Sequence, residues 1–176
     1  MDKLMNNVMF KGMCFFFMIR DFFRPRSNIL MEVEIKPGDH VLDYGCGPGG
    51  YVPPVAELVE NSGRVYALDI NPLAAKRVQR IALKTQLANV QTVCSDCKTG
   101  FQDDSLDVVL LYDIFHMLSD PNWVLKELHR VLKPNGILSF SDHHMKENEI
   151  MSKITGGGFF GLSKKGKRTY SFLKRV

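Results

Sequence analysis

The sequence is poor in cysteine, has no long apolar run and contains no repeated or low-complexity stretch. Its four cysteines are too few and too unevenly spaced for the disulfide framework of a small secreted domain. The uncharged run at residues 12–19 is far short of the roughly 20 residues that a membrane-spanning helix needs, and no small-residue cleavage site follows it. These absences argue against a secreted, a signal-bearing and a transmembrane protein, and they predict a cytoplasmic location.

Acidic side chains are missing from residues 151–176, which carry seven basic ones. Residues 1–30 carry five basic and two acidic side chains, whereas residues 31–150 carry 11 basic and 17 acidic ones. This net negative charge in the middle segment argues against a protein that binds nucleic acid over a whole face. The length of 176 residues suits one domain. We expect it to cover residues 1–176, with an N-terminal cap helix in 1–30, a body at 31–150 and a C-terminal β-hairpin at 151–176.

Strand-like and helix-like patterns alternate through the middle of the chain. Short apolar runs predict strands at residues 40–43, 64–69, 90–94, 106–112 and 137–140. Periodicity and capping residues predict helices at residues 4–23, 52–60, 72–83 and 122–132. A basic turn at 164–167 should join two final strands. The order predicts a Rossmann-like, doubly wound α/β fold: a seven-stranded, mostly parallel sheet with a C-terminal antiparallel hairpin.

An acid ends or directly follows each of the five predicted parallel strands, and a glycine-rich turn follows the first of them. Ligands of such sheets bind beyond the carboxyl ends of the strands, where glycine lets a ligand approach the backbone. The spacing of Gly45, Gly47 and Gly50 also fits a dinucleotide fingerprint. Asp43, two places before the first glycine, would repel a pyrophosphate but attract an ammonium group. The five acids are Asp43, Asp69, Asp96, Asp113 and Asp142.

These residues carry a resemblance to a known family. The segment at residues 41–49, Val-Leu-Asp-Tyr-Gly-Cys-Gly-Pro-Gly, resembles motif I of the class I S-adenosylmethionine-dependent methyltransferases. Residues 67–71, 95–96 and 106–109 agree with the family's later motifs in order and spacing. Residues 125–136 resemble a segment of the quinone-biosynthesis C-methyltransferases, the methyltransferase domain 11 group. The resemblance covers about residues 35–142 and implies S-adenosyl-L-methionine as cofactor, with S-adenosyl-L-homocysteine as product.

The resemblance also implies roles for individual residues. Gly45, Cys46 and Gly47 would line the methionine part of the cofactor, with Asp43 near its amino group. Asp69 would accept hydrogen bonds from the ribose hydroxyls, which a carboxylate does well. Further residues would contact the adenine (Asp96, with Ile70 and Cys97 packing on the ring) and border the sulfonium (Tyr112).

Methyl transfer from a sulfonium is an in-line displacement, so positioning supplies much of the catalysis and a base is needed only if the acceptor must lose a proton. The candidates for catalytic residues are His116, Tyr112 and His143. We expect no metal site. Consecutive residues at a strand end, such as His143 and His144, should point in opposite directions, and Cys94 and Cys97 lack a second ligand pair.

The acceptor is the open question. The sequence favours a small molecule, apolar if the Phe- and Met-rich N-terminal helix covers it, or anionic or membrane-associated if the basic ends attract it. Two alternatives remain: an RNA methyltransferase that uses the basic termini, and a non-catalytic cofactor-binding protein.

Overall fold

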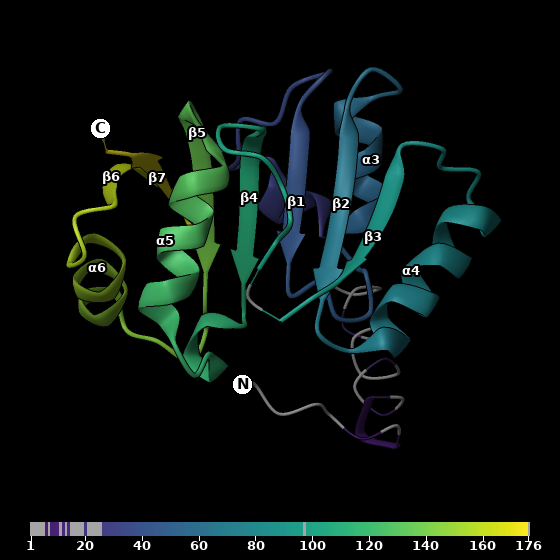
Figure 1. Ribbon diagram of the computed structural model, residues 1–176, viewed down its shortest axis with the longest axis horizontal. Helices are drawn as coiled ribbons and strands as arrows, with labels where there is room; N and C mark the ends of the chain where they lie inside the picture. Colours follow the sequence, from purple (N-terminus) through teal and green to yellow (C-terminus); the bar gives the residue numbers. More distant parts are fainter. Residues whose placement is uncertain are drawn as a thin grey trace.

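A seven-stranded mixed sheet forms the centre of the molecule, in the order β3-β2-β1-β4-β5-β7-β6 (Figure 1). The computed structural model describes residues 26–96 and 98–175, together with residues 6, 8–10, 12, 14 and 20. Strands β1 to β5 are parallel, and β7 pairs antiparallel with both β5 and β6. The strands are β1 (His40–Tyr44), β2 (Arg64–Asp69), β3 (Val90–Cys94), β4 (Leu106–Tyr112), β5 (Leu132–Ser141), β6 (Phe160–Lys165) and β7 (Tyr170–Lys174).

Helices connect the parallel strands and begin at the capping residues that the sequence offers. The Asn71 side chain accepts a hydrogen bond from the Leu73 amide at 3.0 Å, and Asp120 accepts one from the Trp123 amide at 3.0 Å. A proline occupies the first helical position after each cap. The helices are α2 (Ser27–Leu30), α3 (Val52–Val59), α4 (Pro72–Lys84), the 3-10 turn η1 (Phe115–Met117), α5 (Pro121–Val131) and α6 (Glu147–Thr155).

The helices cover both faces of the sheet, so the strands are buried on both sides. Buried residues of α2, α3 and α4 pack against Val41, Val65 and Val108 on one face. Those of α5 and α6 pack against Leu42 and Leu111 on the other. In Figure 1, α5 accordingly lies in front of the strands and α3 behind them. The fold therefore matches the predicted doubly wound sheet with its antiparallel C-terminal hairpin.

Two predicted boundaries are wrong. Residues 133–136, between the helix predicted at 122–132 and the strand predicted at 137–140, lie within β5 at a shift of register against β4. The hairpin begins only at Phe160, because residues 147–155 form helix α6. Only Ile150 and Ile154 of that helix are buried, which left a weak apolar pattern in the sequence.

The N-terminal helix predicted over residues 4–23 falls largely outside the described residues. Residues 8–10, 12, 14 and 20 are helical, and the Phe10 and Cys14 side chains are buried in the core. In the part of the chain that the structure describes, no helix is both long and apolar enough to cross a membrane.

Candidate active site

A cavity of about 1170 Å³ opens at the carboxyl ends of the parallel strands. This is the edge at which the arrowheads of β1 to β5 lie in Figure 1. All five acids predicted at the strand ends line it, and so does the glycine turn after β1. The remaining walls come from η1, α6, the turn between β6 and β7, and the described N-terminal residues Phe10 and Arg20.

The glycine turn brings the backbone close to neighbouring elements. Gly45 has φ +77°, and a Cβ atom there would lie 2.9 Å from Cγ1 of Ile114. Gly47 has φ +49°, also in the left-handed region that favours glycine. The amides of Gly45 and Cys46 both donate to the carbonyl of Leu68, at 2.8 and 2.9 Å. The turn is therefore anchored to the end of β2.

Asp69 ties the glycine turn to the start of α4. Its two carboxylate oxygens accept from the backbone amides of Gly47 and Asn71, each at 2.8 Å. Burial raises the pKa of Asp69, and these two N–H donors oppose the rise. Each oxygen keeps a second lone pair, so the carboxylate is able to accept two hydroxyl groups from a ligand in the cavity.

Asp43 is the most deeply buried acid of the site, with 3% of its surface exposed. Its Oδ2 is buried and has no hydrogen-bond partner among the described residues. Burial raises the pKa of Asp43 to about 7, and the nearby charge of Asp69 adds to the rise. An unpaired buried carboxylate is costly, and a cation bound beside it would supply the missing partner.

The remaining predicted cofactor residues that the structure describes also line the cavity. Ile70 and Cys46 line it, and burial raises the pKa of the Cys46 thiol well above its ordinary value. Asp96 is exposed, lines the cavity and accepts a hydrogen bond on its backbone oxygen from the Tyr44 hydroxyl at 3.1 Å. Cys97 lies outside the described residues.

A buried acid outside the motifs, Glu127, anchors the loop after β3. Glu127, on α5, accepts from the Thr99 amide at 3.1 Å and from the Thr99 hydroxyl at 2.6 Å, and it pairs with Arg130 at 2.7 Å. Burial opposes ionisation, but the hydrogen bonds from Arg130 and Thr99 outweigh it and lower the pKa of Glu127 to about 2. The loop that contains Asp96 and Thr99 is thereby held against helix α5. In the sequence, Glu127 could have been noticed as an acid at a core-facing position of the predicted amphipathic helix.

Tyr112, at the end of β4, lines the cavity, but its hydroxyl is engaged inside the sheet. That hydroxyl lies 2.6 Å from the Ser139 hydroxyl, and the ring contacts Tyr51 edge-on with centroids 4.9 Å apart. Burial raises the pKa of Tyr112 far above that of an ordinary phenol. The geometry therefore suits Tyr112 to a role in lining the cavity rather than to accepting a proton from the acceptor molecule.

Two strand-end aspartates hold two histidines in a crossed arrangement. Asp142, after β5, accepts from the His116 amide at 3.1 Å and lies 2.8 Å from His116 Nδ1. Asp113, after β4, makes the same two contacts to His143, at 3.2 and 2.7 Å. The His144 ring neighbours both, with centroids 4.2 Å from His116 and 3.9 Å from His143. The expected divergence of His143 from His144 is wrong, because both lie in a turn beyond the end of β5.

The fold and this site together define a class of protein. A sheet whose strand β7 is reversed between β5 and β6, a glycine turn after β1 and an acid at the end of β2 are the features of class I S-adenosylmethionine-dependent methyltransferases. The family model of the methyltransferase domain matches residues 42–140, and the chain belongs to this family.

Known proteins with similar sequences or structures agree with this assignment. A demethylmenaquinone methyltransferase of Lactobacillus johnsonii is 30% identical over 141 residues, which are 78% of this chain and 57% of that protein. An (S)-coclaurine N-methyltransferase of Thalictrum flavum is 28% identical over 147 residues, covering 80% of this chain and 40% of that protein. The crystal structure of a methyltransferase from Aquifex aeolicus superposes with a TM-score of 0.74 at 26% identity, covering 84% of this chain and 87% of that one. The chain spans about half the length of the curated relatives it matches.

The cofactor of this class is S-adenosylmethionine, and the observed donor set fits it. The unpartnered Oδ2 of Asp43 suits an ammonium group, and the Asp69 carboxylate suits a pair of hydroxyls. The glycine turn leaves room for a ligand to lie against the backbone, because it lines the cavity without side chains at Gly45 and Gly47.

Proposed function

We propose that this chain transfers a methyl group from S-adenosylmethionine to a small-molecule acceptor. The observation that carries the proposal is that the cavity lined by the strand-end acids and the glycine turn is also lined by apolar side chains. These apolar residues are Met117, Leu118, Met145, Ile150 and Tyr170. At about 1170 Å³ the cavity exceeds the roughly 300–1,000 Å³ typical of a site for one ligand. The named relatives act on a demethylmenaquinone and on (S)-coclaurine, both of them small molecules.

Three strand-end acids would hold the cofactor. Asp43 would pair with its amino group, Asp69 would accept from its ribose hydroxyls, and Asp96 would accept from its adenine amino group. The buried position of Asp43 and the two fixed amide contacts of Asp69 support these roles, because both carboxylates are already held in place before a ligand binds.

The cofactor supplies an electrophilic methyl group on a sulfonium, with a neutral thioether as leaving group. The chain's own contribution is to orient the acceptor in line with that methyl group and to exclude water from the cavity. Where the acceptor carries a dissociable proton, the proton would pass to Nε2 of His116, since Nδ1 is bound to Asp142. The Asp142 side chain is fully buried and would stabilise the imidazolium that forms.

His116 is a better candidate for this base than His143. The His116 side chain is 26% exposed and its partner carboxylate 0%, whereas the values for His143 and Asp113 are 65% and 28%. The more enclosed pair holds its imidazole in one orientation toward the cavity, as a base that acts on a bound acceptor requires.

Calorimetry with S-adenosylmethionine and S-adenosylhomocysteine tests the cofactor half. Asp69→Asn should bind both at least about tenfold more weakly, since it loses charge-assisted hydrogen bonds. Glu57→Gln removes one exposed negative charge on α3 outside this cavity and should bind like the wild type. Unchanged binding by Asp69→Asn would refute the ribose assignment, and a wild type that binds neither compound would refute the proposed function.

Release of S-adenosylhomocysteine in the presence of phenols, quinols and amines tests the transfer. His116→Ala should lower the rate constant kcat about a hundredfold for an acceptor that loses a proton, with partial recovery on addition of imidazole. His143→Ala is the matched control, and imidazole should not change its rate. Turnover that requires RNA would support the RNA alternative instead, and cofactor binding without turnover of any acceptor class would support the non-catalytic one.

A further inference from the structure

Charge is segregated within the cavity. All five acids that line it lie at the carboxyl ends of the parallel strands. The lysine and arginine side chains that line it come from elsewhere: Arg20 and Arg26 from the N-terminal part, and Lys165, Lys167 and Arg168 from the β6–β7 turn. The β6–β7 turn lies beyond Tyr170, which pairs with Phe140 near the carboxyl end of β5, so a ligand in the cavity meets positive charge from elements other than the parallel strands.

The β6–β7 turn is held in place by Glu32, which follows α2. Oε2 of Glu32 accepts from the Arg168 amide, the Thr169 amide and the Thr169 hydroxyl, each at 3.0 Å. Burial opposes ionisation of Glu32, but these hydrogen bonds outweigh it and lower its pKa. The carboxylate also packs directly against Gly166, where a Cβ atom would overlap it. The turn is thus a fixed wall of the cavity.

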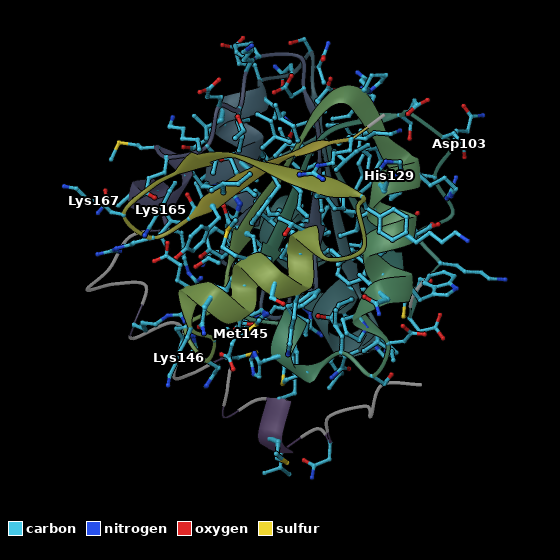
Figure 2. The ribbon with its side chains drawn as sticks, turned by 90° about the vertical axis from the view of Figure 1, so that its left-hand side faces the viewer. Asp103, His129, Met145, Lys146, Lys165 and Lys167 are labelled. Atoms are coloured by element: carbon cyan, nitrogen blue, oxygen red, sulfur yellow. The ribbon has the colours of Figure 1, made fainter. Side chains whose placement is uncertain are left out.

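The cations of the turn are not equivalent. The Lys165 ammonium lies 2.6 Å from both carboxylate oxygens of Glu147 and is neutralised by them. Lys167 and Arg168 are exposed, and no carboxylate of the described residues lies within ion-pair distance of their side-chain nitrogens. Figure 2 shows Lys165 and Lys167 at the tip of the hairpin, on the side of the molecule away from His129. Two cations at this wall are therefore available to a ligand.

Apolar side chains line the same cavity. Ile150 belongs to the first turn of α6 and Met145 precedes that helix, Met117 ends η1 and Leu118 follows it, and Tyr170 is the first residue of β7. Methionine side chains adapt to ligands of different shape, so this part of the wall suits an apolar body rather than a densely polar one.

We propose that the acceptor is an amphipathic anion, with its carboxylate or phosphate group against Lys167 and Arg168 and its apolar part between α6 and η1. This assignment rests on the proposed function and names the substrate class of the same site. The positive wall would orient the acceptor with its anionic end away from the acids around the cofactor. Like charges would oppose the reverse orientation.

The test uses three probes of one chain length: octanoate, octyl phosphate and octanol. Binding is measured by calorimetry or NMR on the full chain saturated with S-adenosylhomocysteine. Octanoate or octyl phosphate should bind about tenfold or more tightly than octanol, and the anion's advantage should shrink at high salt. The comparison of octanoate with octyl phosphate shows which anionic group the site takes.

Lys167→Ala and Arg168→Ala, singly and together, should remove the preference for the anion and leave the affinity for octanol unchanged. Lys164→Ala is the matched control, because Lys164 lies in the same hairpin, pairs with Glu34 and does not line the cavity. Equal binding of the three probes, or an equal loss in Lys164→Ala, would overturn the proposal. Saturation with S-adenosylhomocysteine is checked first, so failure of the cofactor site is seen separately from failure of the anion site.

Discussion

Replacing Asp43 by asparagine should stabilise the cofactor-free protein while weakening its affinity for the cofactor. The carboxyl group is 3% exposed, lies near Asp69 and has an Oδ2 without a hydrogen-bond partner among the described residues. Its charge is therefore a cost to folding that only a bound cation offsets. The amide of asparagine keeps the shape and carries no charge.

The pKa of this carboxyl fixes the size of the effect and its sign. The pKa is about 7 in the folded protein against an ordinary value of 3.8, so the folded state binds the proton more tightly. The wild type therefore loses stability as pH rises from about 4 to about 7, and the full cost is present above that range. By this reasoning Asp43→Asn should exceed the wild type in free energy of unfolding by about 2 kcal/mol at about pH 5.5 and about 4 kcal/mol at about pH 8.5.

Urea unfolding of the cofactor-free protein at several pH values measures this difference. Asp96→Asn is the control: it removes an exposed acid of the same cavity and should change the free energy of unfolding by less than about 0.5 kcal/mol at each pH. A stability gain for Asp43→Asn that does not grow with pH would refute the claim that the buried charge of Asp43 destabilises the cofactor-free protein.

The same carboxyl should make cofactor binding depend on pH. If Asp43 pairs with the amino group, binding requires the ionised form, so the wild-type affinity should fall about tenfold for each pH unit below about 7. Calorimetry in buffers of different ionisation enthalpy should detect the released proton. Asp43→Asn should bind more weakly at pH 8 and show no such pH dependence.

Three further substitutions test how the site is held. Gly45→Ala, at φ +77° and with its new Cβ 2.9 Å from Ile114, should cost about 2 kcal/mol in urea unfolding and weaken cofactor binding. Glu127→Ala should cost about 2 kcal/mol near neutral pH, because it removes one of the two carboxylate partners of Arg130 and leaves the buried Thr99 amide unpaired. Since the pKa of Glu127 is lowered to about 2, this contribution is present above its ordinary value of 4.5 and is lost as pH falls toward 2. Glu32→Ala should weaken the binding of octyl phosphate without changing that of S-adenosylhomocysteine.

Much of the cofactor side could be read from local sequence. Apolar runs that each end in an acid predict strands and place their carboxyl ends at one edge, because parallel strands share a direction. The structure confirms that edge, and all five acids line its cavity. Asn71 and Asp120 were recognisable as caps for the same reason, since capping depends on residues close in sequence.

The features that the sequence did not predict depend on contacts between residues far apart in the chain. Glu127 holds a loop 28 residues away, and Glu32 holds a turn more than 130 residues away, at Thr169. Helix α6 is placed by burial of Ile150 and Ile154 against other elements rather than by a strong pattern of its own. Such contacts follow only once the chain has folded, because local propensity says nothing of distant partners.

The sequence by itself determined the class of fold, the cofactor and the acids that line the cavity, since each rests on short motifs with local physical causes. Only the tertiary structure decided which histidine pairs with which aspartate, and that the basic turn of the hairpin lines the same cavity as those acids. The crossed pairing of the histidines and aspartates is possible because β4 and β5 lie side by side. The position of the basic turn depends on Glu32, which accepts hydrogen bonds from residues more than 130 positions away in the sequence.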